Sequence, residues 1–464
     1  MSLLEDIYNK SPCFVQTVML NIKAVELYRE RYGKKFWKLF EQFDQNQWMS
    51  IADLHEMQSL GLQNIVEHAY ETVPYYRRVL KERHIVPSDI KSLDDLYKLP
   101  VLTKTDIKQN YKDLLSTTIS RKNVRHGHTS GTTGTPLNVS YDIQTCVLHH
   151  VADWRQKKWA GLEYGNSYAS LQGRIVAPVS QKKPPFWRKN FINNQLFLSA
   201  FHLTEANLPY YFDKLAKDSI QFLEGYPSNI FILALYLKNK GIVFPMKAIL
   251  TSSETLFDYQ KEVIEQAFCC RIFDFYGMAE RVVFASECEK HQGHHLNLDY
   301  GITEFLDSSY NPIQVGELGT IVATSLHNYA MPLLRYQTND SCSLRARPCA
   351  CGRGFPLMDA VATKNEAIVT LPDGRLISPS VLTHPFKPMV NVLESQIIQE
   401  AKNLLRVKIV KNEFYSIKDE RKLVTGFAER LGDDIKIEVE YVEKISRTKN
   451  GKFKWVISKI KPTF

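Results

Sequence analysis

The sequence has no long hydrophobic run and few cysteines. Its most apolar stretch, residues 231–237, is far shorter than the roughly 20 residues that cross a bilayer. The N-terminus MSLLEDIYNK carries acidic residues where a secretory signal carries basic ones, and no apolar stretch follows it. Eight cysteines in 464 residues are too few for a disulfide scaffold. We therefore expect no membrane span, no export and a reducing cytoplasm.

The sequence also lacks low-complexity tracts, internal repeats and blocks of like charge. Its net charge of +9 comes from basic residues interspersed with acidic ones, which is typical of a solvated surface and not of a nucleic-acid footprint. A hydrophobic content of 44% with 23% charged residues is that of an ordinary globular protein. A chain of this length predicts a large domain and at least one smaller domain.

Hydrophobic periodicity predicts an α/β fold. Residues 1–120 read as a mostly helical start of a large domain that extends to residue 360. A strand at 248–250, a helix capped by Thr255 with Asp258 at capping-box spacing, and a strand at 272–275 form a strand-helix-strand unit, with a ligand-binding loop expected at Tyr276 and Gly277. After a linker at 361–366, alternating segments at 404–410 and 435–442 flank an amphipathic helix at 417–431, which predicts a small α+β domain over residues 367–464.

The segment TSGTTGTP at residues 129–136 combines two glycines with several hydroxyl side chains. Backbone N–H groups and hydroxyls in such a loop can surround a phosphate with little steric hindrance. The segment is not the P-loop of NTPases, because that motif ends in Gly-Lys-Ser/Thr and this one ends in Gly134, Thr135 and Pro136. On composition alone, a plain polar turn is an equally good interpretation.

The ordered string TSGTTGTP resembles the phosphate-binding signature of acyl-adenylate-forming enzymes. The strings GYPSNIFILALYL, SSE, DFYGMAE, MPLLRYQTND, CACGR and RTKNGKFK follow it in the family's order. Together they are similar to the phenylacetate-CoA ligase and CapK-like branch, and PPFWRKN and HLNLDYG are similar to its CapK side, which is often associated with capsular polysaccharide biosynthesis. The resemblance implies an ATP site that includes Thr129, Ser130, Gly131, Thr132, Thr133, Gly134, Ser253 and Glu254, with Thr132 also catalytic.

Two further strings carry residues with a physical role in such a site. Tyr276 and Gly277 offer an aromatic face beside an unhindered backbone, which suits an adenine ring. Glu280 offers a hard carboxylate oxygen for a Mg²⁺ ion that bridges phosphates. The resemblance implies the same roles. It also implies that Asp340 accepts the ribose hydroxyls, as the acceptor-only oxygens of a carboxylate can, while Arg335 supports the site without touching the reacting atoms.

Lys452, in the RTKNGKFK string, resembles the family's mobile lysine, which neutralises charge between the carboxylate and the α-phosphate. Composition alone favours a solvated basic tail, because Lys449, Lys454 and Lys459 lie nearby. The resemblance implies that the small domain carrying Lys452 rotates between two half-reactions about the linker at 361–366. The linker departs from the family pattern, since it reads ATKNEA where family members have a Gly-Arg…Asp-Asp string.

A cysteine and histidine cluster predicts a structural zinc site. Cys349 and Cys351 are separated by one residue, and Cys288 precedes His291, His294 and His295. Three thiolates and one imidazole complete a closed tetrahedral site for Zn²⁺. Some members of the branch bind zinc in this way. The histidine directly before Leu296 matches best, which favours His295, and His294 is the alternative ligand.

We therefore expect an AMP-forming carboxylate ligase that uses ATP and Mg²⁺. The activated acyl group would pass to CoA, or to an amine or sugar acceptor in polysaccharide or natural-product biosynthesis. The alternative from another function class is an inactive binding protein of the same fold, stabilised by zinc. A homodimer is compatible with the sequence. The acyl pocket cannot be located from the sequence; Tyr226, Pro227, Phe186 and Trp187 are candidates, although aromatic residues in such places are more often core.

Overall fold

The computed structural model of the chain describes residues 3–129, 137–361, 367–377, 379–389, 391–446 and 454–460. The chain begins with helices, as the sequence predicts, and Gly33 separates the second from the third. Ser50 caps the fourth helix, because its hydroxyl accepts a hydrogen bond from the Asp53 N–H at 3.2 Å. These elements are α1 (Leu3–Lys10), α2 (Cys13–Arg31), α3 (Lys34–Asn46), α4 (Ile51–Thr72), α5 (Pro74–Glu82), η1 (Pro87–Asp89), η2 (Leu93–Lys98), α6 (Lys104–Gln109) and η3 (Arg121–Asn123).

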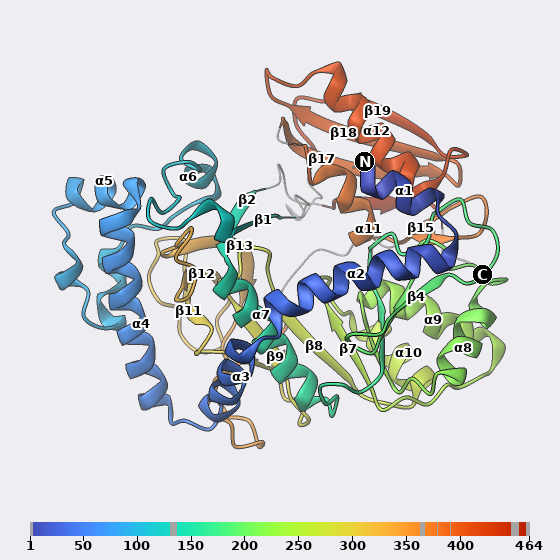
Figure 1. Cartoon of the computed structure of the whole chain (residues 1–464). Helices are drawn as coiled ribbons and strands as arrows, with labels where there is room; N and C mark the ends of the chain where they lie inside the picture. Colours follow the sequence, from blue (N-terminus) through green and yellow to red (C-terminus); the bar gives the residue numbers. More distant parts are fainter. Residues whose placement is uncertain are drawn as a thin grey trace.

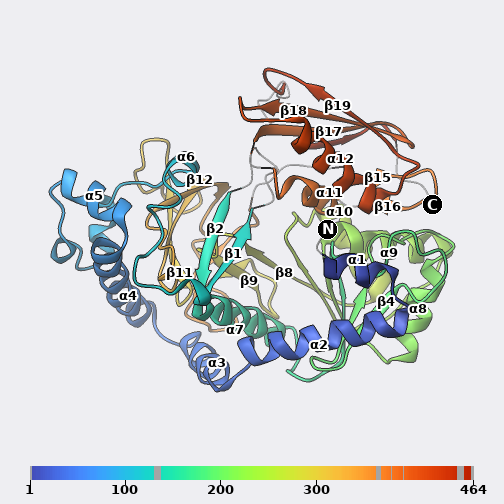
Figure 2. The ribbon, with the colours of Figure 1, turned by 45° about the horizontal axis from the view of Figure 1, so that its top comes forward.

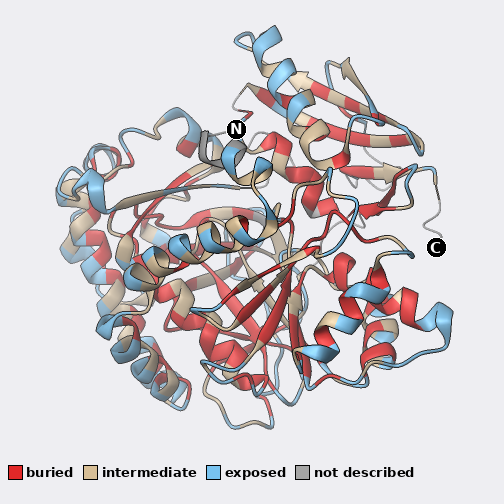
Figure 3. Cartoon of the chain, turned by 45° about the vertical axis from the view of Figure 1, so that its right-hand side comes forward, coloured by how far each residue is buried: buried red, intermediate tan, exposed pale blue. Residues whose placement is uncertain are grey.

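A nine-stranded sheet forms the centre of the large domain (Figures 1 and 3). Its order is β14-β10-β9-β8-β7-β6-β3-β5-β4, and β5, β3, β6, β7 and β8 run parallel. The strands are β3 (Tyr168–Leu171), β4 (Trp187–Asn190), β5 (Gln195–Leu198), β6 (Phe222–Gly225), β7 (Ala248–Ser252), β8 (Ile272–Gly277), β9 (Phe284–Glu287), β10 (His294–Leu296) and β14 (Leu357–Met358). The expected α/β architecture is confirmed.

Helices cover both faces of this sheet. On one face, α8 (Leu208–Lys217), α9 (Pro227–Lys240) and α10 (Asp258–Phe268) pack in one core with Leu223 and Ile249 of the sheet. On the other face, α3 and α7 (Ile143–Trp159) share a core with Ala248 and Phe273. The apolar run at 231–237 thus lies in the packed helix α9. Among the described residues, no helix is both long and apolar enough to span a bilayer.

Two details of the predicted strand-helix-strand unit are wrong. Helix α10 begins at Asp258, so Thr255 is not its cap; the backbone N–H of Phe257 is instead satisfied by the Gln260 side chain at 3.2 Å. Strand β8 continues through Tyr276 and Gly277, because these residues pair with the antiparallel strand β9. The expected loop therefore begins only after Gly277.

A hairpin and a second sheet lie beside the central sheet. The hairpin pairs β1 (Val124–His128) with β2 (Asn138–Asp142), and the three-stranded sheet contains β11 (Gly301–Leu306), β12 (Gly319–Ser325) and β13 (Tyr336–Cys342). Residues of α4 and α5 share a core with this sheet. Figure 2 shows strands β1 and β2 extending toward the C-terminal sheet.

The C-terminal part has its own four-stranded sheet and core, in the order β19-β18-β17-β20. The predicted strands at 404–410 and 435–442 and the helix between them are confirmed. The elements are β15 (Val369–Thr370), β16 (Leu376–Ile377), α11 (Pro379–Thr383), η4 (His384–Phe386), β17 (Val392–Ala401), β18 (Leu404–Lys411), α12 (Ile417–Leu431), β19 (Lys436–Tyr441) and β20 (Val456–Ser458). Arg375 and Leu376 donate to the carbonyls of Phe201 and Leu203, which ties this part to the large domain.

Candidate functional site

Tyr276 and Asp340 meet across the two sheets of the large domain. Tyr276 lies near the end of β8 and Asp340 lies in β13, and the tyrosine hydroxyl donates to the Asp340 carboxylate, Oη to Oδ2, at 2.8 Å. Burial, with the charge of Asp340, raises the pKa of the Tyr276 hydroxyl well above its ordinary value. The hydroxyl therefore stays protonated as a donor. The structure thus brings an aromatic face and an acceptor carboxylate together from positions 64 residues apart.

Glu280 lies beside this pair, directly after β8. It is only 6% exposed, and its Oε1 accepts the hydroxyl of the fully buried Tyr336 at 2.7 Å. Its Oε2 makes no hydrogen bond within the described residues. A buried carboxylate with one oxygen fixed and the other available suits a hard cation such as Mg²⁺. Tyr336 was not predicted as a site residue, although it stands in the RYQTND string four residues before Asp340.

The described part of the TSGTTGTP loop is Thr129. Its N–H donates to the Leu137 carbonyl at 3.0 Å, and the Leu137 N–H donates to its hydroxyl at 2.9 Å. These two bonds close the base of the loop at the end of the β1–β2 hairpin. Ser130, Gly131, Thr132, Thr133 and Gly134 lie outside the described residues.

Ser253 and Glu254 follow β7 at the carboxyl edge of the parallel strands. Ser253 is exposed and has a left-handed backbone, with φ of 70°. Glu254 Oε2 accepts both the hydroxyl of Ser228 and its N–H, the latter at 3.0 Å, at the start of α9. Glu254 therefore also satisfies the N-terminus of that helix.

Lys452 and linker residues 362–366 lie outside the described residues. The chain after Lys452 is anchored, because Trp455 is fully buried in the C-terminal core and its indole N–H donates to the Ser395 hydroxyl at 3.0 Å. The Lys454 carbonyl accepts a hydrogen bond from the Gln396 side chain at 2.7 Å. These contacts anchor Lys454, the last residue of the RTKNGKFK string, to the C-terminal sheet.

The acyl-pocket candidates and Arg335 make contacts that are typical of core packing or of structural support. Phe186 is fully buried and stacks on His202 with ring centroids 4.7 Å apart, so its role is core packing. Trp187 also packs against that core, while Tyr226 and Pro227 begin α9. Arg335 is buried and forms a two-pronged ion pair with Glu304 at 2.8 and 2.9 Å. The ion pair with Glu304 agrees with a supporting role for Arg335.

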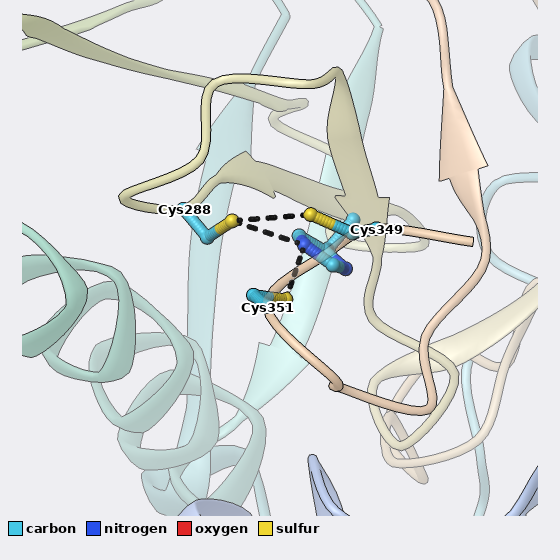
Figure 4. A group of neighbouring side chains, drawn as sticks. Cys288, Cys349 and Cys351 are labelled. Carbon is cyan, nitrogen blue, oxygen red and sulfur yellow. Dashed lines mark hydrogen bonds between the residues drawn. The ribbon is translucent and has the colours of Figure 1, made fainter. Parts of the chain in front are cut away.

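The predicted zinc ligands converge on one point (Figure 4). The Nε2 atom of His295 lies 3.3 Å from the Cys288 sulfur and 3.4 Å from the Cys351 sulfur, and the sulfurs of Cys288 and Cys349 are 3.6 Å apart. All four ligand atoms lie within 4.8 Å of one another. Cys288 follows β9, His295 lies in β10, and Cys349 and Cys351 come from the segment between β13 and β14.

The surroundings of this cluster favour metal coordination by His295. Its Nδ1 is 3.2 Å from the Phe355 carbonyl, which leaves Nε2 facing the thiols, and burial lowers its pKa to about 4, so the ring is neutral near pH 7. His294 is instead 3.0 Å from the Asp274 carboxylate. Backbone N–H groups of Lys290 and Arg353 point at two of the sulfurs. The donor set therefore fits Zn²⁺ with no open position.

The chain is similar to known proteins over most of its length. Residues 369–459 match the family model described as the CapK C-terminal domain. Protein CapK of Staphylococcus aureus is 27% identical, over 99% of this chain and 100% of the relative. A phenylacetate-coenzyme A ligase of Thermus thermophilus is 26% identical, over 68% of this chain and 72% of the relative.

Among solved structures, a 2-hydroxyisobutyryl-CoA ligase in complex with 2-HIB-AMP and CoA has a TM-score of 0.57 and 19% identity. The match covers 89% of this chain and 92% of the ligase. At this identity, the likeness establishes the fold.

Proposed function

Because this chain belongs to the phenylacetate-CoA ligase and CapK-like branch of the acyl-adenylate-forming enzymes, we propose that it converts a carboxylate into an acyl-adenylate with ATP. The observation that carries the proposal is the cluster of Tyr276, Asp340, Glu280 and Tyr336, which joins β8 to β13. It combines an aromatic surface, an acceptor carboxylate for a diol and a carboxylate for a cation in one place.

In the proposed reaction, a carboxylate oxygen attacks the α-phosphorus of ATP. The new bond is the phosphorus–oxygen bond of the acyl-adenylate, and the bond to the β-phosphate breaks, so pyrophosphate leaves with the electron pair. Mg²⁺ bound by Glu280 would supply charge neutralisation at the phosphates. The loop from Thr129 would hold the phosphates, Tyr276 and Gly277 the adenine, and Asp340 the ribose. Lys452 would neutralise charge between carboxylate and α-phosphate, so catalysis is mainly positioning and electrostatics.

The proposed acceptor in the second half-reaction is CoA or another thiol or amine. CoA is supported by the named activities of the phenylacetate-coenzyme A ligase and 2-hydroxyisobutyryl-CoA ligase relatives. One observation favours a different acceptor, such as a sugar amine or hydroxyl: the relative that matches the whole chain and the model that matches its C-terminal domain are both of CapK type. Thioester formation with CoA, measured against amide or ester formation, separates these two functions.

The cluster of Cys288, His295, Cys349 and Cys351 is proposed to hold structural zinc. Four protein ligands leave no position for substrate or water, so no catalytic step is assigned to the metal. The proposed ion would join β9, β10 and the segment before β14 at the edge of the central sheet. Its expected contribution is therefore to the stability of that edge.

ATP–pyrophosphate exchange over a panel of aryl, fatty and amino acids tests the proposed function. We expect acid-dependent exchange in the wild type and at least about 100-fold less in Glu280→Gln and Lys452→Ala. Arg271→Met is the matched control, because Arg271 is exposed and, within the described residues, its side chain pairs only with Glu265 on α10. Absence of exchange with every acid, in a protein that binds ATP, would favour an inactive binding protein. Full activity of Lys452→Ala would remove the role assigned to that lysine.

A further inference from the structure

Two tyrosines and two carboxylates form a reciprocal pair between the turn after β8 and strand β13. Tyr276 and Glu280 stand four residues apart in the first segment, and Tyr336 and Asp340 stand four residues apart in the second. The Tyr276 hydroxyl donates to Asp340 at 2.8 Å, and the Tyr336 hydroxyl donates to Glu280 at 2.7 Å. Each segment thus provides one tyrosine and one carboxylate, and each tyrosine holds the carboxylate of the other segment.

This pairing fixes one oxygen of each carboxylate and leaves the other available. In the part of the chain that the structure describes, Glu280 Oε2 and Asp340 Oδ1 make no hydrogen bond. The first residue of one segment pairs with the last residue of the other, so the two segments run in opposite directions at this point. Because both spacings are four residues, this register sets the separation of the two carboxylates.

A third tyrosine ties the same turn to the β1–β2 hairpin. The hydroxyl of Tyr141, on β2, donates to the carbonyl of Ala279, directly before Glu280. Directly after Glu280, the Arg281 guanidinium lies over the Tyr141 ring, 4.2 Å from its centroid. Gly127 on β1 leaves room for this tyrosine, since a Cβ atom there would lie 2.5 Å from the Tyr141 hydroxyl oxygen. Both sequence neighbours of Glu280 therefore contact one side chain of the hairpin that leads into the TSGTTGTP string.

The three hydroxyls are suited to act as fixed donors. Tyr336 is fully buried and Tyr141 is 4% exposed. Burial raises the pKa of Tyr141, Tyr276 and Tyr336 above the ordinary tyrosine value, and the nearby carboxylates raise it further in the last two. Each hydroxyl therefore keeps its proton near pH 7. A buried donor to a carboxylate makes a stronger hydrogen bond than a neutral pair does, so it holds its acceptor in one orientation.

We propose that Tyr141, Tyr276 and Tyr336, together the tyrosine frame, are positioning residues that align the Mg²⁺ carboxylate with the ribose carboxylate and the phosphate loop. These roles rest on the proposed function, and they add to it the groups that set its geometry. Tyr336 and Tyr141 act through Glu280. The hydroxyl of Tyr276 acts through Asp340, separately from the contact of its ring with adenine. A misplacement of about 1 Å in such a site can cost about 100-fold in rate.

Phenylalanine variants test the tyrosine frame, because each removes one hydroxyl and keeps the ring. The assays are ATP–pyrophosphate exchange at increasing Mg²⁺ concentration and calorimetric binding of ATP without Mg²⁺. Tyr336→Phe and Tyr141→Phe should each lower kcat by about 10-fold and raise the Mg²⁺ concentration for half-maximal exchange, while Mg²⁺-free ATP binding stays within about twofold of wild type. Tyr276→Phe should instead weaken Mg²⁺-free ATP binding by about 10-fold. In a Glu280→Gln background, Tyr336→Phe should not change the Mg²⁺ dependence further.

Tyr211→Phe is the matched control for the loss of a buried hydroxyl. Tyr211 is fully buried on α8, and its hydroxyl donates to the Ser199 carbonyl at 2.7 Å within the core on that face of the central sheet. Its removal should lower the melting temperature, because a buried acceptor loses its donor. Exchange, its Mg²⁺ dependence and ATP binding should match wild type. The control therefore separates a positioning role from a structural one.

Three results would overturn the tyrosine frame. Tyr336→Phe could keep the wild-type kcat and Mg²⁺ dependence, Tyr276→Phe could keep the wild-type ATP affinity, or the losses in all variants, Tyr211→Phe included, could follow the melting temperature alone. If no acid supports exchange in the wild type, the proposed function fails instead. ATP binding with and without Mg²⁺ then decides the frame: a gain in affinity with Mg²⁺ that Tyr336→Phe abolishes supports it, and no gain or an unchanged gain rejects it.

Discussion

Asp340→Asn is the most direct test of the proposed nucleotide site. Asp340 Oδ2 already accepts the Tyr276 hydroxyl at 2.8 Å, and its other oxygen remains as an acceptor. The asparagine keeps an oxygen for Tyr276 and introduces an NH₂ group in place of the second oxygen. The change therefore preserves the contact between β8 and β13 while removing the charge and one acceptor that two ribose hydroxyls would use.

The expected loss of ATP affinity follows from the number of hydrogen bonds affected. A hydrogen bond to a charged group contributes about 1.5–3 kcal/mol, and at least one such bond to the ribose is lost or reversed. This corresponds to roughly 10- to 150-fold weaker binding of ATP. Because Asp340 is not one of the four clustered ligands, metal content should not change.

Calorimetric titration of ATP into wild type and Asp340→Asn measures the loss of ATP affinity directly. Asp307→Asn is a suitable control, since Asp307 is exposed and, among the described residues, accepts hydrogen bonds only from Ser309 and Asn311 after β11. Melting temperatures of all three proteins verify that they fold alike. An ATP affinity within about twofold of wild type in Asp340→Asn, beside an intact melting transition, would refute the assignment of the ribose to Asp340.

Three further outcomes are expected. Cys351→Ser should lower zinc from about one ion per chain and reduce the melting temperature, as measured by elemental analysis and thermal unfolding; full zinc content in the variant would contradict the site. The buried ion pair of Arg155 with Asp299, at 2.6 Å, predicts that Asp299→Leu alone destabilises by about 3–5 kcal/mol and that adding Arg155→Met recovers part of the loss in urea unfolding. Since burial lowers the pKa of His149 to about 3, its contribution to stability is complete above about pH 6.5 and is lost as pH falls toward 3. Unfolding free energies between pH 7 and 4 should therefore fall less steeply in His149→Gln, whereas exposed His55→Gln should match wild type.

The sequence predicted those elements whose periodicity is long or strict. The strand at 248–250 and the helix at 417–431 appear where expected, because alternation or a one-sided apolar face leaves few other ways to bury these side chains. The cap at Thr255 was wrong because Gln260 satisfies the Phe257 N–H, and a capping spacing cannot show which of two nearby polar residues makes the bond. Strand β8 was too short in the prediction, since its last residues depend on pairing with β9.

The candidate sites also divide into local patterns that were predictable and long-range contacts that were not. The grouping of Cys288 and His295 with Cys349 and Cys351 was predictable, because thiols and imidazoles are uncommon and their spacing is local within each half. Tyr336 was missed although it fixes Glu280, because the contact joins residues 56 positions apart. Phe186 was open between pocket and core, and only its stacking on His202 assigns it to the core.

The turn after β8 positions the carboxylate that is proposed to hold Mg²⁺. A strand that ended at Phe275 would leave Glu280 and Arg281 on a free loop, but pairing with β9 and the Tyr141–Ala279 bond hold the segment on both sides. Glu280 then contacts Tyr336 of β13, whereas Arg281 lies over the Tyr141 ring of β2. Since Glu280 is fixed to this short backbone and to Tyr336, the carboxylate proposed to hold Mg²⁺ has a set position. Alignment of the phosphates for adenylation would then depend on one structural element.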